Sequence, residues 1–240
     1  SKSMESKGGV PLAVKALRHE VVVAENKTEP DWLWAKHLLA DRVDTEEKRL
    51  LYADLVGRRK SFGIEDPLYI GTFANYLQVL SQKEQDEVVG SFEASIARRF
   101  TRPLNNDDRN LLTWGTNRAV DVRLRQGEFG VARKCCQICL AAYGLFPQIN
   151  RNRLDELPLS LLVCVCNYIE LETKTNESKK ALAFAQDFVD LSIDSGKTKV
   201  QNSVVAEAVA ASFKRGGRDD LAKAISSRAK ARLVYPKRGQ

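Results

Sequence analysis

The chain has 240 residues, a formal net charge of +7, 43% hydrophobic residues and 29% charged residues. This composition excludes a fully disordered chain, and no run approaches the roughly 18 apolar residues that a membrane-spanning helix needs. Its length allows one large domain or two small ones. Residues 201–240 contain nine Lys or Arg and three Asp or Glu, so they carry +6, whereas the first 200 residues carry +1.

Helix-start signals recur along the first half of the chain. Asp44 or Thr45 is expected to cap a helix over 46–60. Further along, Ser81 and Glu84 have the spacing of a capping box. Both signals precede apolar residues spaced by three and four, which is typical of helices with one buried face.

The second half continues the same helical spacing. The run from Leu159 to Cys166 would also suit a buried strand, but its place within a long helical series favours a helix. The sequence therefore predicts an all-α fold of ten or eleven helices. The predicted helices in this half cover 107–126, 128–144, 159–173, 177–195, 199–214 and 218–233.

Short connections group the helices into antiparallel hairpins. Hairpin spans of roughly 35 to 45 residues fall in the range of stacked helical-repeat proteins. We expect a right-handed stack of about five hairpins in a single domain over 10–235, after a disordered or tag-derived segment (1–9) and before a basic tail (236–240). The predicted hairpins cover 31–62, 67–101, 107–146, 152–195 and 199–234.

An internal similarity joins two stretches 90 residues apart. Gly127 aligns with Gly217, and Ala132 with Ala222, in the stretches RQGEFGVAR and RGGRDDLAK. The glycine is expected to end the first helix in a left-handed turn, and the alanine five residues later lets two helices approach closely. A weaker copy, TNESKKA, occupies 175–181.

At these residues the chain resembles the tetratricopeptide and pentatricopeptide helical-repeat superfamily. Residues 122–147 are most similar to a pentatricopeptide unit, with Gly127 between the helices, the small Ala132, and a closing Gly144-x-x-Pro147. The tetratricopeptide pattern fits less well, because Pro147 lies too far beyond Gly127. The resemblance implies an α-solenoid that binds RNA or protein, with base-reading positions near Asn117, Arg118 and Ala208.

Basic residues provide the second functional signal. Arg118 and Arg125 lie seven residues apart and so on one side of their helix. With other basic residues they would form a stripe that neutralises RNA phosphates, and the charge excess would concentrate these contacts at the C-terminal end. Solvated helix faces and favourable helix-dipole interactions are the alternative explanation. The predicted RNA-binding residues are Asn117, Arg118, Arg125, Arg151, Lys214, Arg215, Arg218 and Lys223.

Three functions are compatible with these signals. The leading hypothesis is a non-enzymatic module that binds single-stranded RNA in an RNA-processing or translation-related assembly. The alternative is a tetratricopeptide-like protein–protein adaptor or scaffold that holds a peptide or partner helix, which the near-neutral first 200 residues favour. A compact all-α viral nucleocapsid-type protein is the third. No membrane, cofactor or small-molecule substrate is indicated.

Catalytic and metal-binding patterns have weaker support. His19 and His37 stand alone in helical segments, without a nucleophile tied to them by any motif. The cysteines could hold zinc or lie as free thiols in the core, and the second is favoured because residues two apart point about 200° apart on a helix. We therefore expect no metal and a reducing compartment, either the cytoplasm or an organelle matrix. The five cysteines are Cys135, Cys136, Cys139, Cys164 and Cys166.

Overall fold

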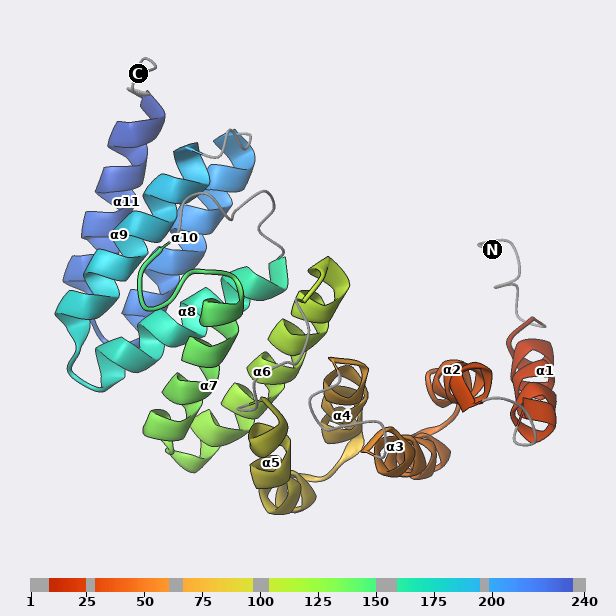
Figure 1. The fold of residues 1–240 in the computed structure, drawn as a ribbon. Coiled ribbons are helices and arrows are strands. Elements are labelled where there is room, and N and C mark those ends of the chain that lie inside the picture. Colours follow the sequence, from red (N-terminus) through yellow and green to blue (C-terminus); the bar gives the residue numbers. More distant parts are fainter. Residues whose placement is uncertain are drawn as a thin grey trace. The chain divides into compact units, whose positions relative to one another are not determined.

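The computed structural model describes residues 9–24, 29–60, 67–96, 104–149, 159–194 and 199–234 (Figure 1). These residues form eleven helices and no strand, which confirms the all-α prediction and the expected number of helices. None of these helices is long and apolar enough to cross a membrane. The helices are α1 (Gly9–Ala24), α2 (Glu29–Ala40), α3 (Thr45–Lys60), α4 (Pro67–Val79), α5 (Gln82–Ile96), α6 (Asn106–Gln126), α7 (Phe129–Ala142), α8 (Leu159–Lys174), α9 (Ser178–Asp194), α10 (Lys199–Arg215) and α11 (Asp219–Val234).

Contacts divide the chain into two compact units, Ser1–Ser95 and Ile96–Gln240. The single domain predicted over 10–235 stays a prediction. The predicted N-terminal segment and basic tail lie outside the described residues, except for Gly9, which begins α1. Among the described residues, a large apolar cluster lies in the second unit and a smaller one in the first.

In the first unit, α1 to α4 pack each against the next helix in the chain. Fully or almost fully buried Tyr52 and Leu55 of α3 belong to its core. In the same unit, the ring of Phe92 on α5 lies 4.8 Å from that of Phe73 on α4.

Two predicted caps in this unit are confirmed. The Asp44 carboxylate accepts hydrogen bonds from the backbone N–H groups of Glu46 and Glu47, both at 3.1 Å, so Asp44 caps α3. At the start of α5, the Ser81 N–H donates to Glu84 at 2.9 Å and the Glu84 N–H donates to the Ser81 hydroxyl at 3.4 Å. This reciprocal pair is the predicted capping box.

In the second unit, α8 is the central helix. It packs against α6, α7, α9 and α10, and α11 packs against α9 and α10 (Figure 1). One continuous apolar core extends from Val120 of α6 to Ala229 of α11. This central position agrees with the apolar character of the 159–166 run, which forms the first half of α8 as a helix and not as a strand.

Three interhelical turns of the second unit share one geometry. In each, a residue with positive φ follows the first helix, and the next N–H donates to the carbonyl five residues earlier at 2.8 or 2.9 Å. An alanine five residues after the positive-φ residue is 0–2% exposed in all three turns. The predicted left-handed glycine turns are thereby confirmed, and the alanines are buried; that they allow close helix approach stays a prediction. The positive-φ residues are Gly127 (75°), Asn176 (64°) and Gly217 (79°), and the alanines are Ala132, Ala181 and Ala222.

The last turns of α8 and α10 are in close contact. A Cβ atom placed on Gly216 would lie 2.6 Å from Thr173 Cγ2 and 2.8 Å from Thr173 Cβ. Beside this contact, Arg215 Nε donates to Glu170 Oε2 at 2.6 Å. Gly216 is therefore required for close approach, whereas Gly217 is required for its positive φ.

Candidate binding groove on the second unit

Asn117, predicted to contact RNA, lies inside the second unit. Its side chain is largely buried, and its Nδ2 donates a hydrogen bond to the Ser160 backbone carbonyl at 2.9 Å. This bond joins α6 to the first turn of α8. The amide donor therefore contributes to helix packing in this structure.

Three of the predicted arginines are paired with carboxylates. Arg118 Nη1 lies 3.9 Å from Asp121 Oδ2, a distant pair between exposed or half-buried groups. Arg218 donates two hydrogen bonds to Asp220, at 2.8 and 2.6 Å, and this pairing lowers the pKa of Asp220 to about 2. Arg215 pairs with Glu170 as described above, and it also donates to the Ser212 hydroxyl at 3.2 Å.

The remaining predicted residues differ in their surroundings. Lys214 and Lys223 are exposed and make no ion pair within the part of the chain that the structure describes. Arg125 is exposed near Asp121, whose carboxylate interacts electrostatically with both Arg118 and Arg125. Arg151 lies outside the described residues.

Carboxylates of α8 and α9 offset much of the C-terminal charge excess. Arg228 donates to both oxygens of Asp190, at 3.1 and 2.6 Å, and Arg232 donates to Asp194 at 2.5 Å. Both acids belong to α9 and lie outside residues 201–240. Glu170, the partner of Arg215, belongs to α8 and also lies outside that range. The folded unit therefore presents less positive potential near its C-terminal helices than their sequence alone indicates.

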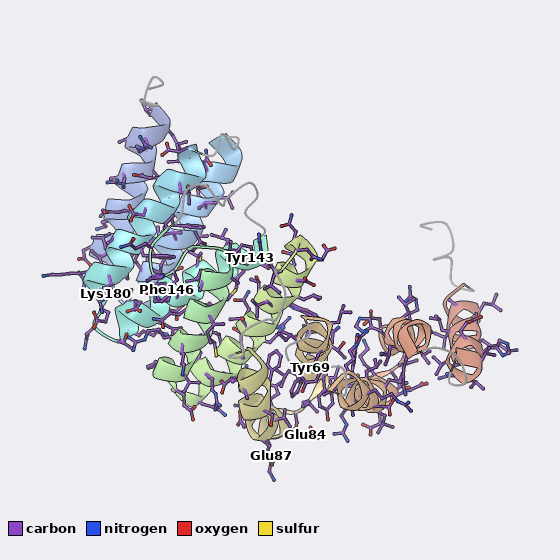
Figure 2. The ribbon with its side chains drawn as sticks, viewed as in Figure 1. Tyr69, Glu84, Glu87, Tyr143, Phe146 and Lys180 are labelled. Carbon is purple, nitrogen blue, oxygen red and sulfur yellow. The ribbon has the colours of Figure 1, made fainter. Side chains whose placement is uncertain are left out.

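A groove of about 530 Å³ lies in this unit and is here called the aromatic groove. One wall is the segment after α7, and the other is α9, with α8 contributing between them. It is lined by residues 146–149, by Tyr168 of α8, and by Lys180, Ala183, Phe184 and Asp187 of α9. Figure 2 labels Phe146 and Lys180, which lie near each other at this site.

The end of α7 directs the chain toward this groove. Gly144 has φ of 70°, and the Leu145 N–H donates to the Leu140 carbonyl at 2.9 Å, so the helix ends in a left-handed turn. Leu145 is then fully buried, while Phe146 and Ile149 pack partly buried against the core. Anchored at these positions, the segment leaves Pro147 and Gln148 exposed.

Perpendicular aromatic contacts form the apolar lining. The rings of Phe146 and Tyr168 meet edge to face with centroids 6.1 Å apart, and those of Tyr168 and Phe184 do so at 5.0 Å. Phe184 in turn stacks on buried Phe188 at 6.4 Å. Such contacts favour defined ring orientations, so the lining is pre-formed.

Tyr168 interacts with Glu172, a buried carboxylate of the core. Its side chain is 5% exposed, and burial followed by the charge and hydrogen bonding of Glu172 raises its pKa. Glu172 is itself 2% exposed, with Arg133 Nη1 at 3.7 Å from its Oε2. The hydroxyl of Tyr168 therefore stays protonated, and its ring makes the edge-to-face contacts of the lining.

The groove-facing surface of α9 carries one charge at each end. Lys180, Ala183, Phe184 and Asp187 have the i, i+3, i+4, i+7 spacing of a single helix face. A neighbouring face of α9 buries Ala181, Ala185 and Phe188 in the core. Chemically, this arrangement is suited to bind an apolar group with charged neighbours, and it contains no pairing of a nucleophile with a base.

The five cysteines lie in the core of the second unit, each 0–7% exposed and free. Contact with the Cys164 thiol, together with burial, raises the pKa of Cys139 well above its usual value. Within the described residues, no group of three or more His, Cys, Asp or Glu side chains is arranged to hold a metal ion. The thiols therefore pack as small apolar side chains here.

Sequence reasoning did not identify the aromatic groove. The motif-based candidates were basic residues and glycine turns, whereas the groove joins residues from three segments that share no motif. A partial signal was present in α9, where Ala183 and Phe184 lie on one face between the charged residues Lys180 and Asp187. Half-exposed aromatic residues at such positions are candidates for contact with a partner.

The chain matches no known protein-family model, and no curated protein shows significant similarity to it.

Proposed function

We propose that this chain is a non-enzymatic, helical-repeat adaptor that binds a segment of a partner protein in the aromatic groove. The observation that supports the proposal is the groove itself, a cavity of about 530 Å³ whose mixed polar and apolar lining includes three aromatic rings in edge-to-face contact. Its size falls within the range of sites that bury a ligand group, and its lining matches the apolar and aromatic composition of such sites. Partner side chains anchored in pockets of this kind supply most of the energy in protein interfaces.

The helix contacts of the second unit support the repeat architecture. Alternate helices pack together, since α8 contacts both α6 and α10, and α9 contacts α11. The three hairpin turns also share their geometry and their buried alanine. Contacts between alternate helices and equivalent turns are expected when similar hairpins stack in one direction. Our proposal is a stack of hairpins that displays the groove on its α9 side.

The test is a peptide-display selection with random 12-residue peptides on the full chain. Ala183 is exposed within the groove, so Ala183→Phe fills the groove without disturbing the core. Ala224→Phe is the matched control, because Ala224 is an exposed helical alanine on α11 outside the groove lining. We expect peptides whose affinity falls at least tenfold in Ala183→Phe and stays unchanged in Ala224→Phe. Selected peptides that bind the unchanged chain, Ala183→Phe and Ala224→Phe with equal affinity would refute the proposal.

Binding of single-stranded RNA is the second candidate, favoured by exposed Lys214 and Lys223. Neither lysine has a carboxylate partner among the described residues, so both remain available to phosphates. Deleting residues 201–240 is not a suitable test of RNA binding, because it would remove Val209, Phe213 and Ile225 from the core and destabilise the fold.

The RNA hypothesis is tested with a labelled 20-mer single strand over a salt titration. It requires affinity that falls steeply with salt and that weakens in the double variant Lys214→Ala with Lys223→Ala. Lys134→Ala with Lys179→Ala is the matched control, since both of these lysines are exposed in the same unit. Absence of binding at low salt, or equal loss in both double variants, would exclude a specific role for Lys214 and Lys223.

A further inference from the structure

The charges at the two ends of the aromatic groove differ in sign. Lys180 and Asp187 are both exposed, and both line the groove from α9. They are seven residues apart, so they lie on one face of the helix and about 10 Å apart along its axis. Ala183 and Phe184 lie between them, at the apolar part of the lining. The helix therefore presents positive charge, apolar surface and negative charge in that order.

Lys180 is available to a partner although it has a neighbour of opposite charge. Its Nζ lies 3.1 Å from Glu177 Oε2, and these side chains are 69% and 42% exposed. An ion pair this exposed contributes little to stability, because water and salt screen it. A partner carboxylate placed over the groove would compete with Glu177 for Lys180. The bound peptide would shield this new ion pair from water, which strengthens it relative to the pair with Glu177.

Asp187 is likewise available at the other end. Its carboxylate interacts electrostatically with Arg228, but both guanidinium hydrogen bonds of that arginine go to Asp190, at 3.1 and 2.6 Å. Asp187 is exposed on the neighbouring turn of α9. A basic group of the partner could therefore pair with the Asp187 carboxylate, because the hydrogen bonds of Arg228 go to Asp190.

We infer that the aromatic groove binds a peptide segment in which a large apolar side chain lies between an acidic and a basic residue, with the acid at Lys180 and the base at Asp187. The inference rests on the proposed function and adds the chemistry and direction of the bound segment. The apolar side chain packs against Phe146, Tyr168 and Phe184 in the lining. The two charges select one direction of the peptide, because the reversed segment would place like charges together.

The experiment repeats the peptide selection on the full chain and on the charge-reversed double variant Lys180→Glu with Asp187→Lys. Both positions are exposed, so the helix content measured by circular dichroism should stay unchanged. Peptides from the wild-type chain should carry acid, apolar and basic residues in one order, and peptides from the variant should carry the opposite order. Synthetic peptides measured by fluorescence polarisation should change affinity by about two- to fivefold for each reversed charge.

Each outcome distinguishes the inference from the proposed function. Peptides that depend on Ala183 but have no charge order, or the same order on both proteins, overturn the inference and leave the adaptor function standing. A selection without any Ala183-dependent peptide overturns the adaptor function itself. Sedimentation of the chain alone provides a further check, because a dimer that Ala183→Phe dissociates would identify a second copy as the occupant and overturn the inference.

Discussion

Replacing Gly216 with alanine provides a direct test of how α8 and α10 pack. The new Cβ would lie 2.6 Å from Thr173 Cγ2 and 2.8 Å from Thr173 Cβ, closer than such atoms approach in folded proteins. Thr173 cannot yield easily, because it is β-branched and its hydroxyl donates to the Ile169 carbonyl at 2.6 Å. The two helix ends must therefore separate, which costs about 1–3 kcal/mol in a packed core. Alanine also lowers the conformational entropy of the unfolded chain, which stabilises the folded state by about 0.4–1 kcal/mol. The net effect of Gly216→Ala should therefore be a decrease of about 1–2 kcal/mol in the unfolding free energy.

Urea unfolding followed by far-ultraviolet circular dichroism measures this effect. Gly130→Ala is the matched control, because Gly130 lies in α7 with no atom within 4 Å of its added Cβ, and this change should stabilise by about 0.5–1 kcal/mol. The double variant Thr173→Ala with Gly216→Ala should recover part of the lost stability. Thr173→Ala removes Cγ2, the atom nearest to the added Cβ, but leaves the Cβ of residue 173 in place. Equal stability of the two glycine variants, or no coupling to Thr173, would show that the reasoning about this contact is wrong.

Three further predictions concern the second unit. Gly127→Ala should destabilise it by about 1 kcal/mol in urea unfolding, because alanine disfavours the φ of 75°; an unchanged midpoint would contradict the turn's role. Burial opposes ionisation of Glu170, but Lys174 and Arg215 outweigh it and lower its pKa below 4.5, so its stabilisation is present above pH 4.5 and lost as the pH falls. The stability difference between wild type and Glu170→Gln should therefore narrow in acid, and a constant difference would argue against the ion pairs. Finally, none of the five buried thiols should react promptly with Ellman's reagent until urea unfolds the chain, so fast labelling of the folded protein would place a thiol at the surface.

The helices were predictable because their signals are local. Capping by Asp44, the Ser81 and Glu84 box, and the left-handed turns at Gly127 and Gly217 each depend on residues within about five positions in the chain. Backbone conformation and short-range hydrogen bonds decide such features, so helix ends in the second unit agree with the predicted ones to within one or two residues.

The candidate site depended on contacts that sequence spacing does not encode. Asn117 is 43 residues from Ser160, whose carbonyl it binds, and Arg215 is 45 residues from Glu170. Asn117 is predicted to contact RNA from the resemblance to pentatricopeptide units, and Arg215 from its place among the basic residues near the C-terminal end. In the folded unit each makes an intramolecular hydrogen bond, so each contributes to helix packing through a contact that is visible only in three dimensions.

By itself, the sequence determined an all-α chain, the positions of its helices, and the glycine and alanine pattern of its turns. Tertiary structure alone decided which charges meet and where a cavity opens. Helices far apart in sequence bring carboxylates of α8 and α9 to the arginines of α10 and α11, which offsets the basic C-terminal region. The same packing joins Phe146, Tyr168 and Phe184 around a groove. The reason is physical, since side-chain burial and ion pairing depend on distances between helices, whereas helix formation depends mainly on neighbours along the chain.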